Sequence, residues 1–221
     1  MCIRDSQGAA AAAGSGPAGR LGVAMAGNRT TFGSLNEPQL VACGTPMAPR
    51  TDYDGQTCSL ARSLEVVGER WTLLIVRDLF FGVRRFTDLQ AHLDIPRAVL
   101  SARLASLVQR GLVERRPYRP GRDAFHLTAC GEELWPVVHT LMQWGDRHFA
   151  GGGRRRVFLH AGCDAELAHD GRCPACGAQP AAADVETRPG PRAADGPRRA
   201  DPVSVALRTP HRLLTPLPVA A

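Results

Sequence analysis

The stretch that decides the fold is Phe86–Arg110, whose sequence is FTDLQAHLDIPRAVLSARLASLVQR. Its first part, Phe86–Leu93, is predicted as a short helix. This helix must end at Asp94-Ile95-Pro96, because proline has no amide hydrogen to donate and its ring clashes with the preceding turn. Proline does suit the first turn of a new helix, and apolar residues then recur at helical spacing as far as Arg110. Two helices joined by a three-residue turn are therefore predicted.

The segments on either side of this pair predict further elements. Apolar residues at helical spacing indicate two helices before it. After it, two runs of strand-forming residues flank Pro120-Gly121, which predicts a β-hairpin, and a long helix follows. The predicted elements are helices at 58–67 and 70–81, strands at 112–118 and 124–127, and a helix at 128–149 with a bend near Pro136. This order predicts a mainly α chain with a small β-hairpin (α+β), the plan of a winged helix-turn-helix.

Composition divides the chain into four regions. Apolar residues concentrate at 56–150, which is the predicted folded domain. Residues 1–55 are rich in Gly, Ala, Pro and Thr and are expected to be disordered. Their first six residues resemble an annotation artefact, with Met25 and Met47 as alternative translation starts. A Cys/His segment follows at 154–178, and an Ala-, Pro- and Arg-rich tail at 179–221 is also expected to be disordered.

The chain of 221 residues is basic, with a net charge of +6, and all 27 of its basic residues are arginine. A basic protein favours polyanionic partners such as nucleic acid, and the guanidinium group suits phosphate and guanine edges. A GC-rich genome produces the same arginine bias, so the composition alone says little about DNA. We find neither an apolar run of about 18 residues nor a signal-peptide pattern. We therefore expect no membrane partner and a cytoplasmic location.

The predicted helix at 96–110 has two chemically different faces. Its leucines form one apolar stripe, while the opposite face carries Arg97, Ser101 and Arg103. A helix of this width fits the major groove of double-stranded DNA, where arginine pairs with guanine and the N-terminal residues reach the base edges. We expect Arg97 and Ser101 to contact bases, with Arg103 next. The alternative is that these side chains are simply solvated.

Four further arginines are candidates for contacts with the DNA backbone. Arg119 and Arg122 flank the tip of the predicted hairpin, and a basic, exposed tip suits a wing that lies on phosphates or in a minor groove. Arg84 and Arg85 lead into the first helix of the helix-turn-helix, where they are placed to hold phosphate. The joint pattern of helix, turn, arginine-bearing helix and basic hairpin is more specific than any one of these residues.

The predicted domain contains seven short sequence motifs. Together, and in this order, they are specific enough to indicate a family. They are Cys58, GERWTLLI at 68–75, RFTDL at 85–89, LSARL at 100–104, GLVER at 111–115, LTACG at 127–131, and Trp144. In this order they resemble the HxlR-type winged helix-turn-helix transcriptional regulators. The resemblance covers roughly residues 56–150.

This resemblance implies a homodimer whose interface is formed by the first helix and the long last helix. It implies binding to a pseudo-palindromic operator, with one recognition helix in each half-site. It also implies a repressor or activator, often of genes for oxidative, aldehyde or quinone stress, with an inducer that the residues do not identify. The apolar positions of the last helix agree with a dimer interface, although they also suit an ordinary core: Leu134, Val137, Val138, Leu141, Met142 and Trp144.

The chain has seven cysteines, an odd number that argues for reduced thiols or metal ligands rather than a disulfide scaffold. Cys58 occupies the position where HxlR-like proteins carry a cysteine just before the first helix. In some members this thiol senses electrophiles or oxidants, and a helix N-terminus favours the thiolate form. Redox sensing at Cys58 is one hypothesis. An unreactive packing residue is the other.

The Cys/His segment carries a pattern typical of a zinc site. His160-x-x-Cys163 is followed after nine residues by Cys173-x-x-Cys176-Gly, and two such pairs can supply four ligands to one tetrahedral zinc ion. His169 is an alternative nitrogen ligand. The segment is too short to fold by its own apolar burial, so metal binding is expected to supply the folding energy of this zinc-ribbon-like unit. The alternatives are a disordered tail with reducible cysteines and a redox dithiol.

No enzyme is expected from this chain. It contains no Walker loop, dinucleotide fingerprint, Gly-x-Ser-x-Gly or His-Glu-x-x-His pattern. A dithiol oxidoreductase would need a strand-helix-strand context that Cys173 and Cys176 lack. A winged-helix protein–protein interaction module with a zinc-binding tail stays as the alternative to a DNA-binding regulator. The basic surface should matter for DNA but not for an apolar docking patch.

Overall fold

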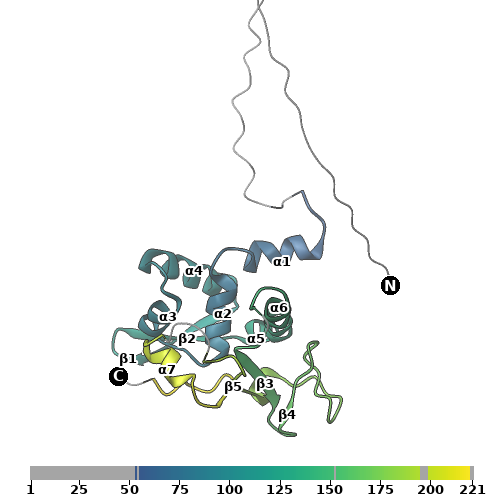
Figure 1. Cartoon of the computed structure of the whole chain (residues 1–221). Helices are drawn as coiled ribbons and strands as arrows, with labels where there is room; N and C mark the ends of the chain where they lie inside the picture. The colour runs from purple at the N-terminus through teal and green to yellow at the C-terminus, as the bar shows by residue number, and fades with distance from the viewer. Residues whose placement is uncertain (1–52, 54, 152, 195–198, 220–221) are drawn as a thin grey trace, which may run out of the picture. The chain divides into compact units, whose positions relative to one another are not determined.

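The predicted winged helix-turn-helix is present in the computed structural model (Figure 1). Helices α1 (Ser59–Val67), α2 (Thr72–Phe80), α3 (Phe86–Leu93) and α4 (Arg97–Gln109) are followed by strands β1 (Val113–Arg119) and β2 (Arg122–Leu127). The two strands pair antiparallel from Val113 opposite Leu127 to Arg119 opposite Arg122. These bounds agree with the predicted elements to within two residues, because each depends on local periodicity and turn chemistry.

The structure describes residues 53, 55–151, 153–194 and 199–219, all within one unit, Pro49–Ala221. The N-terminal region at 1–55, for which disorder was expected, lies outside the described residues apart from Tyr53 and Gly55. The alternative translation starts lie outside them as well.

The turn between α3 and α4 has the expected chemistry. Asp94 adopts the left-handed conformation, with φ of 52°, which an aspartate tolerates better than most residues. Pro96 then caps the N-terminus of α4 with φ of −56°. The leucine stripe of α4, formed by Leu100, Leu104 and Leu107, is at most 1% exposed, so this face is buried and the opposite face is left for solvent or a partner.

The long helix predicted at 128–149 is broken rather than bent. The chain forms α5 (Ala129–Glu132) and then α6 (Trp135–His148), with two turn residues between them. Thr128 caps α5 by accepting a hydrogen bond from the Gly131 amide at 3.2 Å. Pro136 lies in the first turn of α6, where its missing amide costs nothing, whereas it could not have continued α5.

The disordered tail predicted at 179–221 is wrong for the described part of that region. Strand β3 (Arg156–His160) lies between β4 (Ala165–Glu166) and β5 (Val185–Pro189), and β6 (His211–Arg212) pairs with the outer edge of β5. A short 3-10 helix, η1 (Ala182–Asp184), precedes β5, and α7 (Pro202–Ala206) follows it. The tail is rich in Ala, Pro and Arg, but its larger apolar side chains, Val185, Val203, Leu213 and others, are buried in the same core as the winged helix.

A cluster of aromatic rings joins the two halves of this core. Phe158 of β3 packs edge-on against Trp135 of α6, with ring centroids 5.2 Å apart, and stacks on Phe81 at 6.5 Å. Trp135 also packs against Phe80 at 5.4 Å. The C-terminal sheet is therefore packed on α2 and α6 and is not a separate small domain.

The end of the chain binds the loop after α2 through its backbone. The amides of Leu214 and Leu217 donate hydrogen bonds to the carbonyls of Phe80 and Gly82, at 2.8 and 3.0 Å. Gly82 has φ of +80°, and a Cβ built there would lie 1.8 Å from the Thr215 carbonyl oxygen. Glycine is thus needed at this position both for its conformation and for the close approach of the tail.

His139 of α6 is a buried polar residue without a polar partner. Its ring is 0% exposed, it packs against Trp135 and Phe158 with centroids 5.5 and 5.4 Å away, and neither ring nitrogen has a hydrogen-bond partner among the described residues. Burial lowers the pKa of His139 from its usual 6.5 to about 4, against a small opposing effect of Asp170. The imidazole is therefore neutral at physiological pH.

We expect Gly82→Ala to destabilise the protein by about 2–5 kcal/mol, since it adds left-handed strain and a clash with the tail backbone. Gly111→Ala is the matched control, because Gly111 has φ of +75° but a Cβ at that position would have no atom within 4 Å. Gly111→Ala should lower the free energy of unfolding by only about 1–2 kcal/mol. Urea unfolding of the two variants makes the comparison, and equal losses would mean that the tail does not dock on this loop.

We expect the free energy of unfolding to fall as the pH drops from about 6.5 to about 4 through His139. In this window the unfolded chain binds a proton at this residue and the folded chain does not, so acid favours unfolding by up to roughly 3 kcal/mol. His139→Leu should be less sensitive to pH, and it should be close to neutral at pH about 7 because no hydrogen bond is lost. Parallel pH profiles for the two proteins would contradict this account.

Candidate nucleic-acid interface and metal centre

The exposed N-terminal end of α4 presents the two residues expected to reach bases. Arg97 is the first residue of α4, and its guanidinium lies over the ring of Phe86 with 5.1 Å to the centroid. Ser101, one turn later, is exposed on the same helix. The contact with Phe86 restricts the arginine without neutralising its charge, which reduces the entropy lost when it binds.

The β1–β2 hairpin forms a basic wing. Arg119 and Arg122 are exposed and face each other at its tip, where Gly121 adopts φ of 68°. Two further exposed arginines, Arg115 and Arg116, extend the basic surface down β1, and they were not predicted from the sequence. The signal that could have found them is the run of arginines in a strand whose outer part is exposed. Arg116 forms an ion pair with Glu114, so its charge is partly offset.

Arg85 connects the helix-turn-helix to this wing. It is the N-cap residue of α3, it forms an isolated β-bridge with Ala124, and its guanidinium lies 5.7 Å from the ring centroid of Tyr118. The side chain is half-buried. These contacts set the position of the wing relative to α3.

The structure removes Arg84 from the candidate DNA contacts. Its Nη2 donates to the Leu214 carbonyl at 2.6 Å, and its other two nitrogens are buried without a partner among the described residues. Burial lowers the Arg84 pKa, with a further contribution from the charge of Arg116. The side chain points into the junction with the C-terminal tail, for which the sequence predicted disorder.

Arg103 also faces the protein. It forms an ion pair with Glu69 at 3.1 Å, and its side chain is only 29% exposed. In both cases the local sequence does not reveal which partner lies opposite the side chain: Arg84 is in the loop before α3, and Arg103 is on α4. Of the predicted DNA-contacting residues, Arg97, Ser101, Arg119 and Arg122 are exposed.

The four predicted metal ligands converge at the end of β3. The ligand atoms of His160, Cys163, Cys173 and Cys176 all lie within 4.8 Å of one another, and Cys176 Sγ is 3.4 Å from His160 Nδ1. Ligand atoms on a zinc tetrahedron are separated by roughly 3.4–3.8 Å, given zinc–ligand bonds of about 2.0–2.3 Å. The Cys176–His160 pair lies at this separation, and the group as a whole is close enough to hold one ion. The alternative ligand, His169, is exposed and is not in the group.

Local backbone turns bring these ligands together. The amide of Cys163 donates to the His160 carbonyl at 3.1 Å, and that of Gly177 donates to the Cys173 carbonyl at 2.8 Å. Gly177 has φ of 72°, as the end of a Cys-x-x-Cys turn requires. The sequence predicted that metal binding would supply the folding energy of this segment. In the structure, Phe158 and Leu167 also bury apolar surface against the winged helix, so apolar packing contributes as well.

The thiols of the cluster differ in acidity. Burial raises the Cys173 pKa, but hydrogen bonds from the backbone of Cys176 and Ala175 and from the His160 side chain outweigh it and bring the pKa to about 6. The Cys163 pKa is raised to about 11, chiefly by a hydrogen bond with the Cys176 thiol. A thiolate at Cys173 suits a cation, which would in turn favour the thiolate form of the other cysteines.

Cys58 lies apart from this cluster. It is exposed and is the N-cap residue of α1, where the nearby backbone of Ala61 and Leu60 lowers its thiol pKa. Cys130, in α5, is exposed as well.

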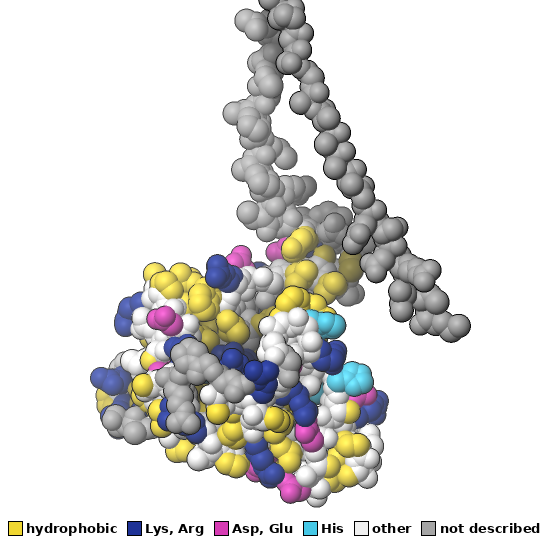
Figure 2. All heavy atoms as spheres, viewed as in Figure 1, with side chains coloured by type: hydrophobic (Ala, Val, Ile, Leu, Met, Phe, Trp, Pro, Cys, Tyr) yellow, Lys and Arg dark blue, Asp and Glu magenta, His cyan; other side chains and the backbone are white. Residues whose placement is uncertain are grey.

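Exposed apolar side chains gather on the helices at either end of the winged domain, and Figure 2 shows hydrophobic surface over α1 and beside α6. Trp144 and Phe149 pack on each other with ring centroids 4.9 Å apart, yet they remain 47% and 74% exposed. The group, here called the α1/α6 surface, consists of Leu60, Leu64, Val137, Leu141, Trp144 and Phe149. Large exposed apolar groups of this kind mark a contact surface.

The fold is that of the winged helix-turn-helix class of DNA-binding proteins. The model of the HxlR-like helix-turn-helix family matches residues 66–151. The uncharacterized HTH-type transcriptional regulator Rv3095 of Mycobacterium tuberculosis is 44% identical over 142 residues, which cover 63% of this chain and 89% of that protein. The chain belongs to the HxlR-like helix-turn-helix family of transcriptional regulators.

Two further similarities cover shorter stretches of the chain. The uncharacterized HTH-type transcriptional regulator YvaP of Bacillus subtilis is 34% identical over 86 residues, 38% of this chain and 80% of that protein. The solved structure of the reduced transcriptional regulator YodB from B. subtilis is 30% identical and covers 44% of this chain and 99% of that one, with a TM-score of 0.38. The 142 residues aligned with Rv3095 exceed the family match at 66–151, so that similarity continues outside the winged helix. Among the residues that the structure describes, no helix is long and apolar enough to cross a membrane.

Proposed function

We propose that this regulator binds double-stranded DNA as a homodimer, with α4 of each copy in a major groove and each wing on the flanking backbone. The observation that carries the proposal is the exposed pair Arg97 and Ser101 at the start of α4, on a helix whose other face is buried. In a recognition helix these positions reach the base edges. Arg97 is assigned to a guanine, which it can contact through two hydrogen bonds.

The basic wing is assigned to phosphate rather than to bases. Its tip arginines, Arg119 and Arg122, are exposed on the two strands of the hairpin, while Glu114 pairs with Arg116. Contacts of this kind are independent of sequence and depend on salt, because each one releases counterions from the DNA.

The α1/α6 surface is assigned to the contact between two copies of the chain. Leu60 and Phe149 are 65% and 74% exposed, and such residues on a free monomer would leave a large apolar patch in water. A two-fold dimer uses the same patch on both copies, which matches an operator with two related half-sites.

We also propose that Cys58 makes the regulator responsive to oxidants or electrophiles. The thiol is exposed, and its pKa is lowered by the amides of the helix N-terminus, the two properties that a reactive cysteine needs. Its helix, α1, also contributes to the α1/α6 surface, so modification there would act on dimerisation.

The base-contact and phosphate-contact roles predict different behaviour for two arginine variants. An operator is first selected from random duplexes with the wild-type protein. For this operator, Arg97→Ala should lose about 1–3 kcal/mol of binding free energy, and its specificity at one base position should relax. Arg122→Ala should weaken binding to all sequences and lower the salt slope by about one. Arg188→Ala, remote from both elements, is the control. An unchanged base preference for Arg97→Ala would exclude its role, and no enriched sequence at all would favour a protein-interaction module.

The dimer assignment predicts that charge on the α1/α6 surface separates the copies. We expect the wild-type chain to sediment as a dimer and Leu60→Glu combined with Phe149→Glu as a folded monomer, because two carboxylates would be buried without partners in the interface. Val205→Glu is the control, since Val205 is also an exposed apolar residue, at 45%, but lies on α7. A dimer that survives the double substitution would place the interface elsewhere.

The metal centre is assigned to one zinc ion. Because all four ligands come from the protein, the site is structural rather than catalytic. We expect one zinc per chain by elemental analysis, lost in His160→Ala and retained in His169→Ala. Chelation should lower the melting temperature but leave the helical signal of the winged helix intact, since the segment also packs through its apolar residues. Equal metal content in the two histidine variants would disprove this ligand set.

A further inference from the structure

A cavity of about 540 Å³ lies between the winged helix and the C-terminal segments. Its walls come from α2, α6, β3 and the region around α7, so it exists only because the tail is folded onto the domain. The volume is within the range of sites that hold small organic molecules. Neither the helix-turn-helix nor the metal ligands line it, apart from His92 at the end of α3.

One side of the cavity is apolar. Phe81, Met142, Pro189 and Leu207 contribute to its lining. The ring of Phe81 has the guanidinium of Arg156 5.3 Å from its centroid and that of Arg77 at 5.8 Å. An apolar or aromatic body would find matching surface here.

The rest of the lining is strongly cationic. The described lining residues include five arginines, Arg77, Arg155, Arg156, Arg199 and Arg208, and a single acidic residue, Asp146. Burial raises the Asp146 pKa, although Arg154 and Arg155 oppose the effect. In Figure 2, arginine side chains gather near the middle of the visible face.

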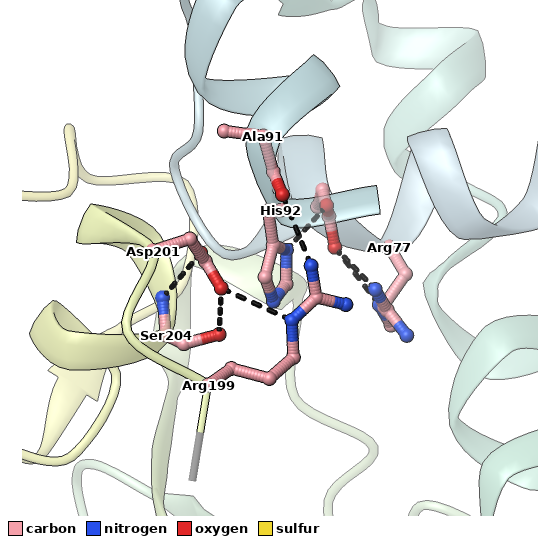
Figure 3. Close-up of polar contacts among 7 residues, drawn as sticks. Arg77, Ala91, His92, Arg199, Asp201 and Ser204 are labelled. Carbon is pink, nitrogen blue, oxygen red and sulfur yellow. Dashed lines mark hydrogen bonds and ion pairs between the residues drawn. The ribbon is translucent and has the colours of Figure 1, made fainter. Parts of the chain in front are cut away.

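Part of this charge is already balanced by two carboxylates just outside the lining. Buried Asp78 pairs with Arg77 at 2.7 Å and with His92 at 2.6 Å, and Asp201 pairs with Arg199 at 3.1 Å (Figure 3). The two arginines, Arg77 and Arg199, are matched by the two carboxylates, so they leave no surplus charge for a ligand. The role of this network is to fix the wall of the cavity.

Arg156 provides charge that these carboxylates do not balance. Its Nε and Nη1 donate to neutral oxygens, Thr187 Oγ1 at 2.8 Å and the Leu207 carbonyl at 2.9 Å, and its Nη2 is buried without a partner among the described residues. Burial and the nearby charge of Arg77 lower the Arg156 pKa to about 10, which leaves the side chain cationic. A buried donor without an acceptor is costly, and an anion beside it would reduce that cost. Arg208 adds a second cation, whose Nη2 donates to the Arg199 carbonyl at 2.9 Å.

We propose that this cavity is a binding site for a small organic anion, with its carboxylate or phosphate on Arg156 and Arg208 and its apolar body against Phe81 and Leu207. Such a head group accepts the forked hydrogen bonds that guanidinium groups donate. The apolar side explains why an organic anion, rather than an inorganic one, is the fitting ligand.

The same cavity wall is attached to the helix-turn-helix. Arg199 Nη2 donates to the carbonyl of Ala91 at 3.0 Å, and both Ala91 and His92 belong to α3 (Figure 3). Asp201 in turn caps α7 by accepting from the Ser204 amide at 2.9 Å. A ligand that shifts Arg199 or α7 therefore acts on α3 directly. The effect of the ligand on α3, and through it on DNA binding, rests on the proposed DNA-binding function. Binding of the ligand to the cavity does not.

The test uses the full chain and three probes that share one body: 2-naphthoate, 2-naphthyl phosphate and the neutral 2-naphthamide. Calorimetry should show at least one of the two anions binding about tenfold or more tightly than the amide. Arg208→Gln and Arg156→Met should each reduce that affinity by about tenfold or more, with folding checked by circular dichroism. Arg188→Gln, on β5 but outside the lining, should bind as the wild type does.

Two results would overturn the site: equal binding of anions and amide, or anion binding that neither cavity variant weakens. Failure of both anions to bind would overturn it as well.

A second measurement, operator affinity with and without the bound anion, tests the link to α3 and should show a change of about threefold or more. Anion binding without that change would overturn the link alone. Absence of any DNA binding would refute the proposed function and leave the calorimetric result intact.

Discussion

The packing of Phe158 against Phe81 and Trp135 is the contact on which the rest of the architecture depends. It places β3 on α2 and α6, and β5 then pairs along β3 from Arg156–Pro189 to His160–Val185. Burying one phenylalanine contributes only about 1.5–3 kcal/mol. The consequence for geometry is larger, because the metal ligands, the cavity and the tail that reaches Gly82 all follow from the position of this strand.

Arginines with the same chemistry have different roles because they differ in burial. Arg97 and Arg122 keep their guanidinium groups in water, where a phosphate or a base can replace the solvent at small cost. Arg84 and Arg156 are turned inward and donate to backbone carbonyls, so they join the winged helix to the C-terminal segments. Arg103 is held by Glu69. Desolvation of a cation is expensive, so an inward arginine is retained only where oxygens or an anion receive its hydrogen bonds.

The metal centre and the cavity show two kinds of site. The candidate ligands of the metal centre are close in the chain, and short turns at Cys163 and Gly177 bring them together. Their spacing therefore predicted a group of four side chains that the structure does bring together, with His160 in the group and His169 outside it. The cavity combines residues from α2, α6, β3 and α7. No spacing rule connects these segments, and the tail that supplies two of its arginines has a composition typical of disorder.

By itself, the sequence determined the winged helix-turn-helix, the exposed Arg97 and Ser101, the basic hairpin tip and the grouping of His160, Cys163, Cys173 and Cys176. These follow from periodicity, proline and glycine turns and short ligand spacings, which act over a few residues and are readable one segment at a time. Only the tertiary structure decided that the tail folds, that α5 and α6 are separate, that Arg84 and Arg103 face inward, and that a cationic cavity lies beside α3. Those outcomes depend on burial against residues distant in the chain, and the free energy of such burial belongs to neither segment alone.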